Sequence, residues 1–313
     1  KPRMISGIFG KTKPINFIIL QGFLFVFYWF VNFVLYKNHY GPEKLVTKFV
    51  VLGVLLFSVF AVDFIVKRNQ ITATNSFAIL YFTMLIVIFP EVLLDDNSVF
   101  CTFFLLLALR RLISLKSLKN LKLKILDATI WTLIASLFYD WAIVYLVLVG
   151  IAIYFYEPKN IKNWLVPLTG IFAVGIIVYS FLIITDNLDF LSNHYQLSLK
   201  FDVMEYWKDS TKLAVYAIFT FIGATMTFIK MSKLGMGKII TMRLIAISLV
   251  LGFTITFLKT SNDIYPVLVT FCPGAIFLAK YVELIKRTTL REIVLIVSVI
   301  APLLVLITQM IVK

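Results

Sequence analysis

The sequence predicts an all-α integral membrane protein with about eleven transmembrane helices, a cytoplasmic N-terminus and a periplasmic C-terminus. Hydrophobic residues make up 61% of the chain and charged residues only 15%, with a mean hydropathy of +0.96. A soluble domain has about 25% charged residues and about half apolar ones. Long apolar stretches recur at short intervals, and Lys and Arg gather in alternate connections between them. The net charge of +14 therefore indicates basic membrane loops and not a nucleic-acid partner.

Each apolar stretch approaches the roughly 20 residues that an α-helix needs to cross the hydrocarbon core. No internal repeat and no Gly-, Ser- or Pro-rich linker divides the chain, so residues 1–313 are predicted to form a single polytopic domain. The expected spans are 15–36, 46–66, 74–93, 98–115, 125–138, 141–156, 163–185, 211–230, 239–258, 265–283 and 292–311.

The charges orient these spans. With the N-terminus placed in the cytoplasm, 22 of the 30 basic residues fall on the inner side, while 11 of the 16 acidic residues fall on the outer side. Basic residues near the ends of membrane helices accumulate on the cytoplasmic side. An odd number of crossings then predicts a periplasmic C-terminus.

Two segments depart from simple crossings. The stretches 125–138 and 141–156 are short and meet at "FYDWA", so this hairpin is expected not to reach the outer surface fully, with Asp140 at membrane depth. Between residues 186 and 210, aromatic and aliphatic residues alternate with polar ones. This pattern predicts an amphipathic segment that lies in the periplasmic interface.

An acidic cluster begins the fourth predicted span, in "FPEVLLDDNSVFCTFFLLLALRRL". Adjacent carboxylates repel one another, so Glu91, Asp95 and Asp96 could supply a general base or ligands for a divalent cation. The alternative is a solvated turn in which Asp96 or Asn97 caps the helix at 98–115. The sequence leaves both open.

Basic residues also allow two interpretations. Lys212 and Lys259 lie on the outer side, where few basic residues occur, and with Asp263 nearby they could hold a lipid phosphate or pyrophosphate. The alternative is that they snorkel to the interface. On the inner side, a basic cluster could bind lipid phosphates or could follow from topology alone; it consists of Arg110, Arg111, Lys116, Lys119, Lys122 and Lys124.

Signatures of soluble enzymes are absent. The sequence has no Walker-type phosphate loop, no G-x-G-x-x-G, no G-x-S-x-G and no H-E-x-x-H. Two histidines and two cysteines, the latter inside apolar runs, indicate neither a zinc cluster nor a disulfide framework.

Three stretches of the chain are distinctive: "FGKTKPINFII", "LLLALRRLISLKSLKNLKLKI" and "YEPKNIKNWLVPL". They resemble an uncharacterised, domain-of-unknown-function family of bacterial polytopic inner-membrane proteins. The resemblance covers most of the chain and implies a multi-pass protein of the bacterial inner membrane. It implies no activity.

In the stretch from Phe89 to Arg111, an acidic turn precedes an apolar run with a basic end. This order resembles, more loosely, the third and fourth spans of the GT-C superfamily of polyprenyl-phosphate-sugar-dependent glycosyltransferases. "YPVLVTFCPGAIFLAKYVELIKR" is similar to a late span of the same superfamily. The superfamily's chief catalytic acid lies in the first outer loop. In this chain, the predicted first outer loop contains one acid, Glu43.

The resemblance implies a GT-C-like arrangement that acts on or binds a lipid-linked substrate at the periplasmic face. Glu43 or Asp96 would then be the catalytic base, and Glu91 and Asp95 would hold a divalent cation. The site for the lipid phosphate would consist of Lys212, Lys259 and Asp263. Membrane lipids are the expected partners. The alternative is a non-catalytic subunit or scaffold of a secretion or surface-assembly complex of the cell envelope.

Overall fold

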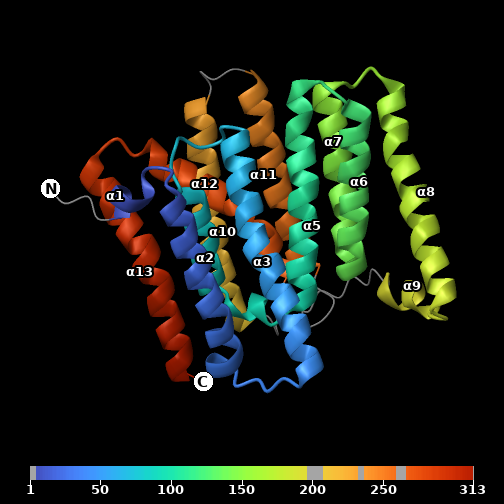
Figure 1. Ribbon diagram of the computed structural model, residues 1–313. Helices are drawn as coiled ribbons and strands as arrows, with labels where there is room; N and C mark the ends of the chain where they lie inside the picture. Colours follow the sequence, from blue (N-terminus) through green and yellow to red (C-terminus); the bar gives the residue numbers. More distant parts are fainter. Residues whose placement is uncertain (1–4, 196–206, 232–235, 259–265, 313) are drawn as a thin grey trace.

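The chain folds into a bundle of α-helices, seen here in a computed structural model (Figure 1). The structure describes residues 5–195, 207–231, 236–258 and 266–312. Within these ranges every regular element is helical and no strand occurs. The first helices are α1 (Ile5–Phe9), α2 (Pro14–Trp29), η1 (Phe30–Leu35), α3 (Pro42–Arg68), α4 (Phe77–Ile88), η2 (Pro90–Leu93) and α5 (Asp96–Ile113).

The remaining helices continue the same up-and-down course. They are η3 (Ser114–Ser117), α6 (Leu121–Phe138), η4 (Asp140–Tyr145), α7 (Leu146–Tyr156), α8 (Ile161–Ile184), α9 (Asp189–His194), α10 (Trp207–Met231), α11 (Met236–Phe257), η5 (Pro266–Thr270), α12 (Phe271–Leu284) and α13 (Thr288–Val312). Each apolar segment expected from the sequence overlaps one of these helices.

The protein is a multi-pass α-helical membrane protein. In the described part of the chain, eight helical segments are long and apolar enough to cross a membrane. They are 14–35, 42–68, 96–117, 161–184, 211–230, 237–257, 266–284 and 288–311. The apolar helices α4 and η4–α7 are shorter.

The centre of the bundle is α4. Eleven of its twelve residues, Phe77 to Val87, are buried. A helix that is apolar on every side is stable only when other helices surround it, and α4 packs against α12, α13, α3 and α2. This placement explains how a helix of twelve residues belongs to the apolar core although it is too short for a full crossing.

The periphery consists of helices that bury little of their surface. In an apolar stretch of 18 residues within α8, only 11% is buried inside the protein, and in the corresponding stretch of α13 only 17% is buried. These two helices stand on opposite sides of the bundle in Figure 1. Their exposed side chains are apolar, as expected for surfaces that face lipid.

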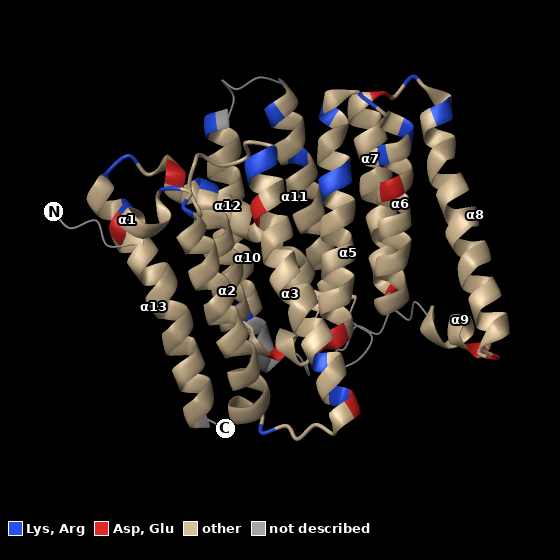
Figure 2. Cartoon of the chain, viewed as in Figure 1, with Lys and Arg blue, Asp and Glu red and all other residues tan. Residues whose placement is uncertain are grey.

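Charged residues mark the two ends of the bundle differently (Figure 2). We call the end where α3 and α5 finish, with Lys67, Arg68, Arg110 and Arg111, the basic end. The acidic end is the opposite one, where α3 and α5 begin. It carries Glu43, Glu91, Asp95 and Asp96.

The hairpin expected at 125–156 is formed by α6 and η4–α7. Asp140 is buried at its tip, where its Oδ1 accepts a hydrogen bond of 2.9 Å from the backbone N–H of Trp141. The short helix α9 lies under this tip (Figure 1). His194 Nε2 is 2.8 Å from the carbonyl oxygen of Ser136, and the Tyr195 hydroxyl is 2.9 Å from the Ser136 hydroxyl.

The segment expected to lie in the interface, residues 186–210, is described only in part. Its first portion forms α9, and residues 196–206 lie outside the described residues. The helix that follows begins at Trp207, four residues before the predicted start at 211. The last residues of the predicted segment therefore belong to α10.

Candidate functional site at the acidic end

The acidic stretch 89–96 is the junction between α4 and α5. Phe89 ends α4 and Pro90 begins the one-turn helix η2, since proline suits the first position of a helix and not its interior. Asp95 then caps α5: its Oδ1 accepts a hydrogen bond of 3.1 Å from the backbone N–H of Ser98. The prediction that Asp96 or Asn97 is the cap was wrong by one or two residues, because α5 begins at Asp96 and not at 98.

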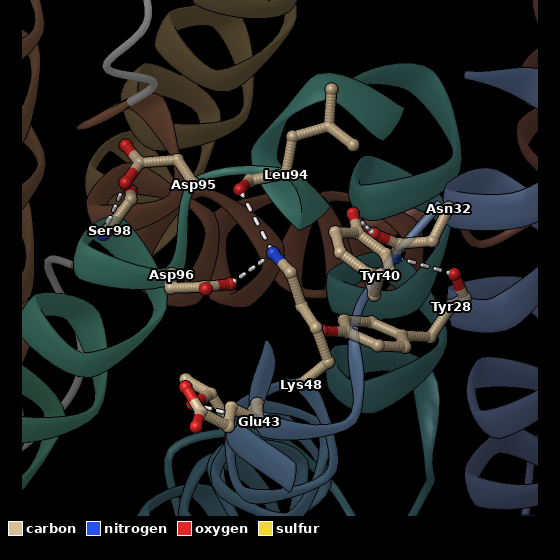
Figure 3. Close-up of polar contacts among 10 residues, drawn as sticks. Tyr28, Asn32, Tyr40, Glu43, Lys48, Leu94, Asp95, Asp96 and Ser98 are labelled. Carbon is tan, nitrogen blue, oxygen red and sulfur yellow. Dashed lines mark hydrogen bonds and ion pairs between the residues drawn. The ribbon is translucent and has the colours of Figure 1, made fainter. Parts of the chain in front are cut away.

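Asp96 forms an ion pair with a lysine of α3. Lys48 Nζ lies 2.6 Å from Asp96 Oδ1 and 3.3 Å from the carbonyl oxygen of Leu94 (Figure 3). The side chain of Lys48 is only 8% exposed, whereas that of Asp96 is 30% exposed. A buried ammonium needs such a partner, so the pair fixes the carboxylate of Asp96 at the start of α5 while one side of it remains open.

Aromatic and amide groups of α2, η1 and the following connection hold Lys48. The Tyr40 ring centroid lies 5.3 Å from Lys48 Nζ, and the Tyr40 hydroxyl donates a hydrogen bond of 2.6 Å to Asn32 Oδ1. Asn32 Nδ2 donates to the carbonyl oxygen of Tyr28 at 2.9 Å. Burial raises the pKa of Tyr40; a hydrogen bond from Asn38 lowers it in part, and the nearby Asp96 carboxylate raises it further. The Tyr40 hydroxyl therefore keeps its proton.

The turn that presents these groups is a π-helix. In η1 the backbone N–H of Tyr36 bonds to the carbonyl oxygen of Val31, five residues earlier. Insertions of this type recur at functional sites. The Tyr28 side chain, one turn before, is fully buried and extends toward Lys48 in Figure 3, and its hydroxyl has no hydrogen-bond partner.

Glu91 forms a second ion pair at the same end of the bundle. Lys212 Nζ of α10 lies 3.1 Å from Glu91 Oε1 and 5.7 Å from the centroid of the Phe89 ring. The side chains of Lys212 and Glu91 are 23% and 13% exposed. Lys212 therefore packs against the junction of α4 and α5, and it pairs with one of the acids predicted to bind a cation.

The other residues predicted for the site are placed differently. Glu43 lies in the first turn of α3, exposed at the acidic end, and in Figure 3 it stands apart from the contacts between Lys48 and Asp96. Lys259 and Asp263 lie outside the described residues. The structure thus brings Asp96, Glu91, Asp95 and Lys212 to one junction, with Glu43 at the same end.

The acids at this junction do not form a metal centre by themselves. No group of three or more His, Cys, Asp or Glu side chains that could hold a metal ion occurs among the described residues. Glu91 is engaged by Lys212, and Asp95 caps α5. A divalent cation at Glu91 and Asp95 would need further ligands, so we derive no chemistry from one.

Sequence reasoning missed Lys48 and the groups that hold it. A signal was present, because Lys48 lies inside the predicted span 46–66, and an ionisable residue within a membrane helix usually marks a functional site. Its partner is 48 residues away. Nothing in a single sequence pairs two residues at that separation.

Comparison with known proteins identifies no relative. The chain matches no protein-family model, no curated protein and no solved structure. Conclusions about function therefore depend on the geometry of the acidic end and on the resemblances carried by the sequence.

Proposed function

We propose that this protein acts on a lipid-linked substrate that carries a phosphate, at the periplasmic face of a bacterial inner membrane, in the manner of the GT-C superfamily. The observation that supports this most directly is the Asp96 carboxylate. It is 30% exposed and is held by a buried lysine where α5 begins. The ion pair holds this carboxylate in place, and its exposed side can reach a substrate hydroxyl in the position of a general base.

The proposed reaction is the transfer of a sugar from a polyprenyl phosphate to an acceptor hydroxyl. The hydroxyl oxygen bonds to the anomeric carbon while the bond from that carbon to the phosphate oxygen breaks. The electron pair of the broken bond stays on the lipid phosphate, and the hydroxyl proton passes to a carboxylate oxygen of Asp96. Lys212 lies at the same end of the bundle, and with Lys259 it would neutralise the phosphate, while Asp263, near Lys259 in the sequence, would orient the lysines.

The orientation of the bundle is part of the proposal. The basic end would face the cytoplasm, because basic residues near helix ends are retained on that side. Eleven crossings, formed by α2 to α8 and α10 to α13, would then bring the acidic end and the C-terminal end of α13 to the periplasm.

A cysteine-labelling experiment tests this orientation. Lys44 at the acidic end and Lys122 at the basic end are both exposed, whereas the native residues Cys101 and Cys272 are buried and should not react. In intact spheroplasts, a membrane-impermeant maleimide should label K44C and should label K122C only after lysis. The reverse pattern would place the acidic end in the cytoplasm and remove the proposal.

The catalytic assignment is tested with D96N in membranes that contain equal amounts of full-length protein. The probe is a polyprenyl-phosphate hexose with a radiolabelled sugar, and the measurement is the loss of label from the lipid. Loss of a general base lowers rates by roughly 10²- to 10⁴-fold. We expect a fall in that range for D96N and activity close to wild type for E43Q, since Glu43 stands apart from the ion pair.

D96E separates chemistry from folding, because it keeps a carboxylate near Lys48. Partial activity in D96E together with inactive D96N supports the role of Asp96 as a base. Wild-type turnover in D96N would reject it. If E43Q alone is inactive, the base is Glu43, the other acid that the sequence resemblance allows.

The second candidate function is that of a membrane subunit of an envelope complex. It is favoured by α8 and α13, of which only 11% and 17% are buried within the chain. Purification in a mild detergent from the native host distinguishes the two. A stoichiometric protein partner favours the subunit, whereas a co-purified polyprenyl phosphate, detected by mass spectrometry, favours the transferase.

A further inference from the structure

At the basic end, a groove lies between two connections of the bundle. One wall is formed by residues 118–123, which lead into α6, and the other by residues 156–163, which lead from α7 into α8. The two halves of the groove have volumes of about 360 and 670 Å³ and share Glu157 and Asn160. Both halves are shallow and open on one side, so the groove could hold a headgroup at its surface but would not enclose it. We call this feature the α6–α8 groove.

The charge of the groove is positive. Lys122, Lys159 and Lys162 line it and are exposed. Its one acid is Glu157, whose Oε2 accepts hydrogen bonds from Asn163 Nδ2 at 3.1 Å and from Asn160 Nδ2 at 3.5 Å. Three lysines and one carboxylate leave the groove with a net charge of +2.

The helices α6 and α8 both begin at the groove, and their first turns strengthen its attraction for anions. A helix N-terminus carries a partial positive charge that acidic residues usually balance. Neither first turn contains an acid. No side chain caps α6, whereas Asn160 Oδ1 caps α8 by accepting a hydrogen bond of 3.2 Å from the backbone N–H of Lys162. Lys122 and Lys162 stand in these turns instead, where they repel the helix dipoles, so an anion in the groove would relieve both repulsions.

Apolar side chains border the same lysines. Leu118, Leu123 and Ile161 line the groove and are 56%, 62% and 74% exposed. Beside them Trp164 is 39% exposed and donates a hydrogen bond of 3.1 Å from its Nε1 to the carbonyl oxygen of Pro158. Tryptophan is enriched at membrane interfaces. Basic groups next to exposed apolar ones fit an amphipathic ligand better than a free ion.

We propose that the α6–α8 groove binds the headgroup of an anionic glycerophospholipid. Its phosphodiester lies among Lys122, Lys159 and Lys162 at the N-termini of α6 and α8, and its acyl chains follow the exposed apolar surface of α8. This site is independent of the function proposed for the acidic end. It is also distinct from a generally basic surface, because three features coincide in it: a hollow, two helix N-termini whose first turns contain no acid, and an apolar rim.

The test compares two triple variants of the full-length protein with the same change in charge. K122Q/K159Q/K162Q removes the lysines of the groove. K11Q/K286Q/R287Q removes three exposed basic residues of the same end that do not line it. The protein is purified in mild detergent and mixed with equal amounts of phosphatidylglycerol and phosphatidylcholine, and the lipid retained is measured by native mass spectrometry.

We expect wild-type protein to prefer phosphatidylglycerol. Each basic residue near an anionic lipid surface contributes appreciably to binding, so the groove variant should lose this preference by about tenfold or more. The control variant should stay within about twofold of wild type, since it keeps the lysines of the groove. The variant K122R/K159R/K162R should keep the preference, because arginine retains the charge.

Three results would overturn the proposal. Equal losses in the two glutamine variants would show that total charge, and not the groove, selects the lipid. An unchanged preference in the groove variant would show that the lipid binds elsewhere. If inorganic phosphate alone stabilised the wild type against heat as much as phosphatidylglycerol, the groove would be a site for a free anion and the assignment to a lipid would fail.

Discussion

The asymmetric burial of Lys48 and Asp96 predicts an asymmetric response to mutation. D96N leaves an ammonium group that is only 8% exposed without its acid, whereas K48M leaves a carboxylate that is 30% exposed and can regain water. Breaking a buried ion pair costs about 3–5 kcal/mol when one charge remains buried. Because Asp96 is partly exposed and water can replace its oxygen, we expect D96N to cost about 2–3 kcal/mol.

The reverse substitution should be milder. K48M removes the buried charge itself and keeps most of the volume of the side chain, so its expected cost is about 1 kcal/mol or less. The double variant K48M/D96N contains no stranded charge and should also lie within about 1 kcal/mol of wild type. The resulting coupling energy between the two sites is about 2 kcal/mol, within the range of residues in direct contact.

The pair formed by Lys67 and Asp63 is a matched control. Its two atoms are also 2.6 Å apart, but the Lys67 side chain is 45% exposed. An exposed pair of this i,i+4 type contributes about 0.3–0.5 kcal/mol, so D63N should have almost no effect. If D96N and D63N shift the free energy of unfolding in detergent equally, or if K48M is more harmful than D96N, burial does not determine the strength of the pair and the reasoning is refuted.

Two further predictions concern the contacts of α10. In G274A the new Cβ would overlap the Tyr216 hydroxyl and lie 3.0 Å from the Tyr216 Cζ, so we expect the free energy of unfolding to fall by about 1–3 kcal/mol. The control is G53A, whose new Cβ would have no neighbouring atom within 4 Å, and which should be neutral or stabilising by up to about 1 kcal/mol. K212M should cost about 1–2 kcal/mol, because it strands Glu91, which is 13% exposed. The midpoint of thermal unfolding in detergent measures both effects. Equal midpoints for G274A and G53A would contradict the first prediction, and a K212M midpoint equal to that of wild type would contradict the second.

The arrangement of helices could be predicted from the sequence to a large extent. Long apolar segments report directly on helices in a membrane protein, because a membrane-spanning backbone must satisfy its own hydrogen bonds. Boundaries were less certain: three consecutive polar residues, Asp95 to Asn97, are all acceptable N-caps, and only the backbone conformation shows that Asp95 is the one used. The π-helix at 30–35 had no signal, since its residues are as apolar as those of the helix that it continues.

The candidate site could be predicted only in part. The acids were visible as a cluster and Lys212 was predicted as a basic site residue, but Lys48 was missed, and neither pairing was foreseen because α3 and α10 are distant from the acids in the sequence. Adjacent carboxylates were expected to repel one another or to share a cation. In the folded protein, Asp96 and Glu91 each have a lysine and Asp95 has the N-terminus of α5, so packing between helices supplies the compensation that the sequence assigned to a metal.

Among the three clustered acids, these partners leave Asp96 with the most accessible carboxylate. Asp95 is buried as a cap and Glu91 is 13% exposed beside its lysine, whereas Asp96 is 30% exposed. A well-packed apolar pair would stabilise α3 against α5 as effectively as a buried ion pair, so stability alone does not explain Lys48. The buried lysine, together with Tyr40 and its bond to Asn32, instead holds one acid in a fixed position at the acidic end with a face left open. If this is its purpose, K48M should reduce turnover of a polyprenyl-phosphate hexose by far more than its small effect on stability, and a K48M protein with normal turnover would leave Asp96 a purely structural residue.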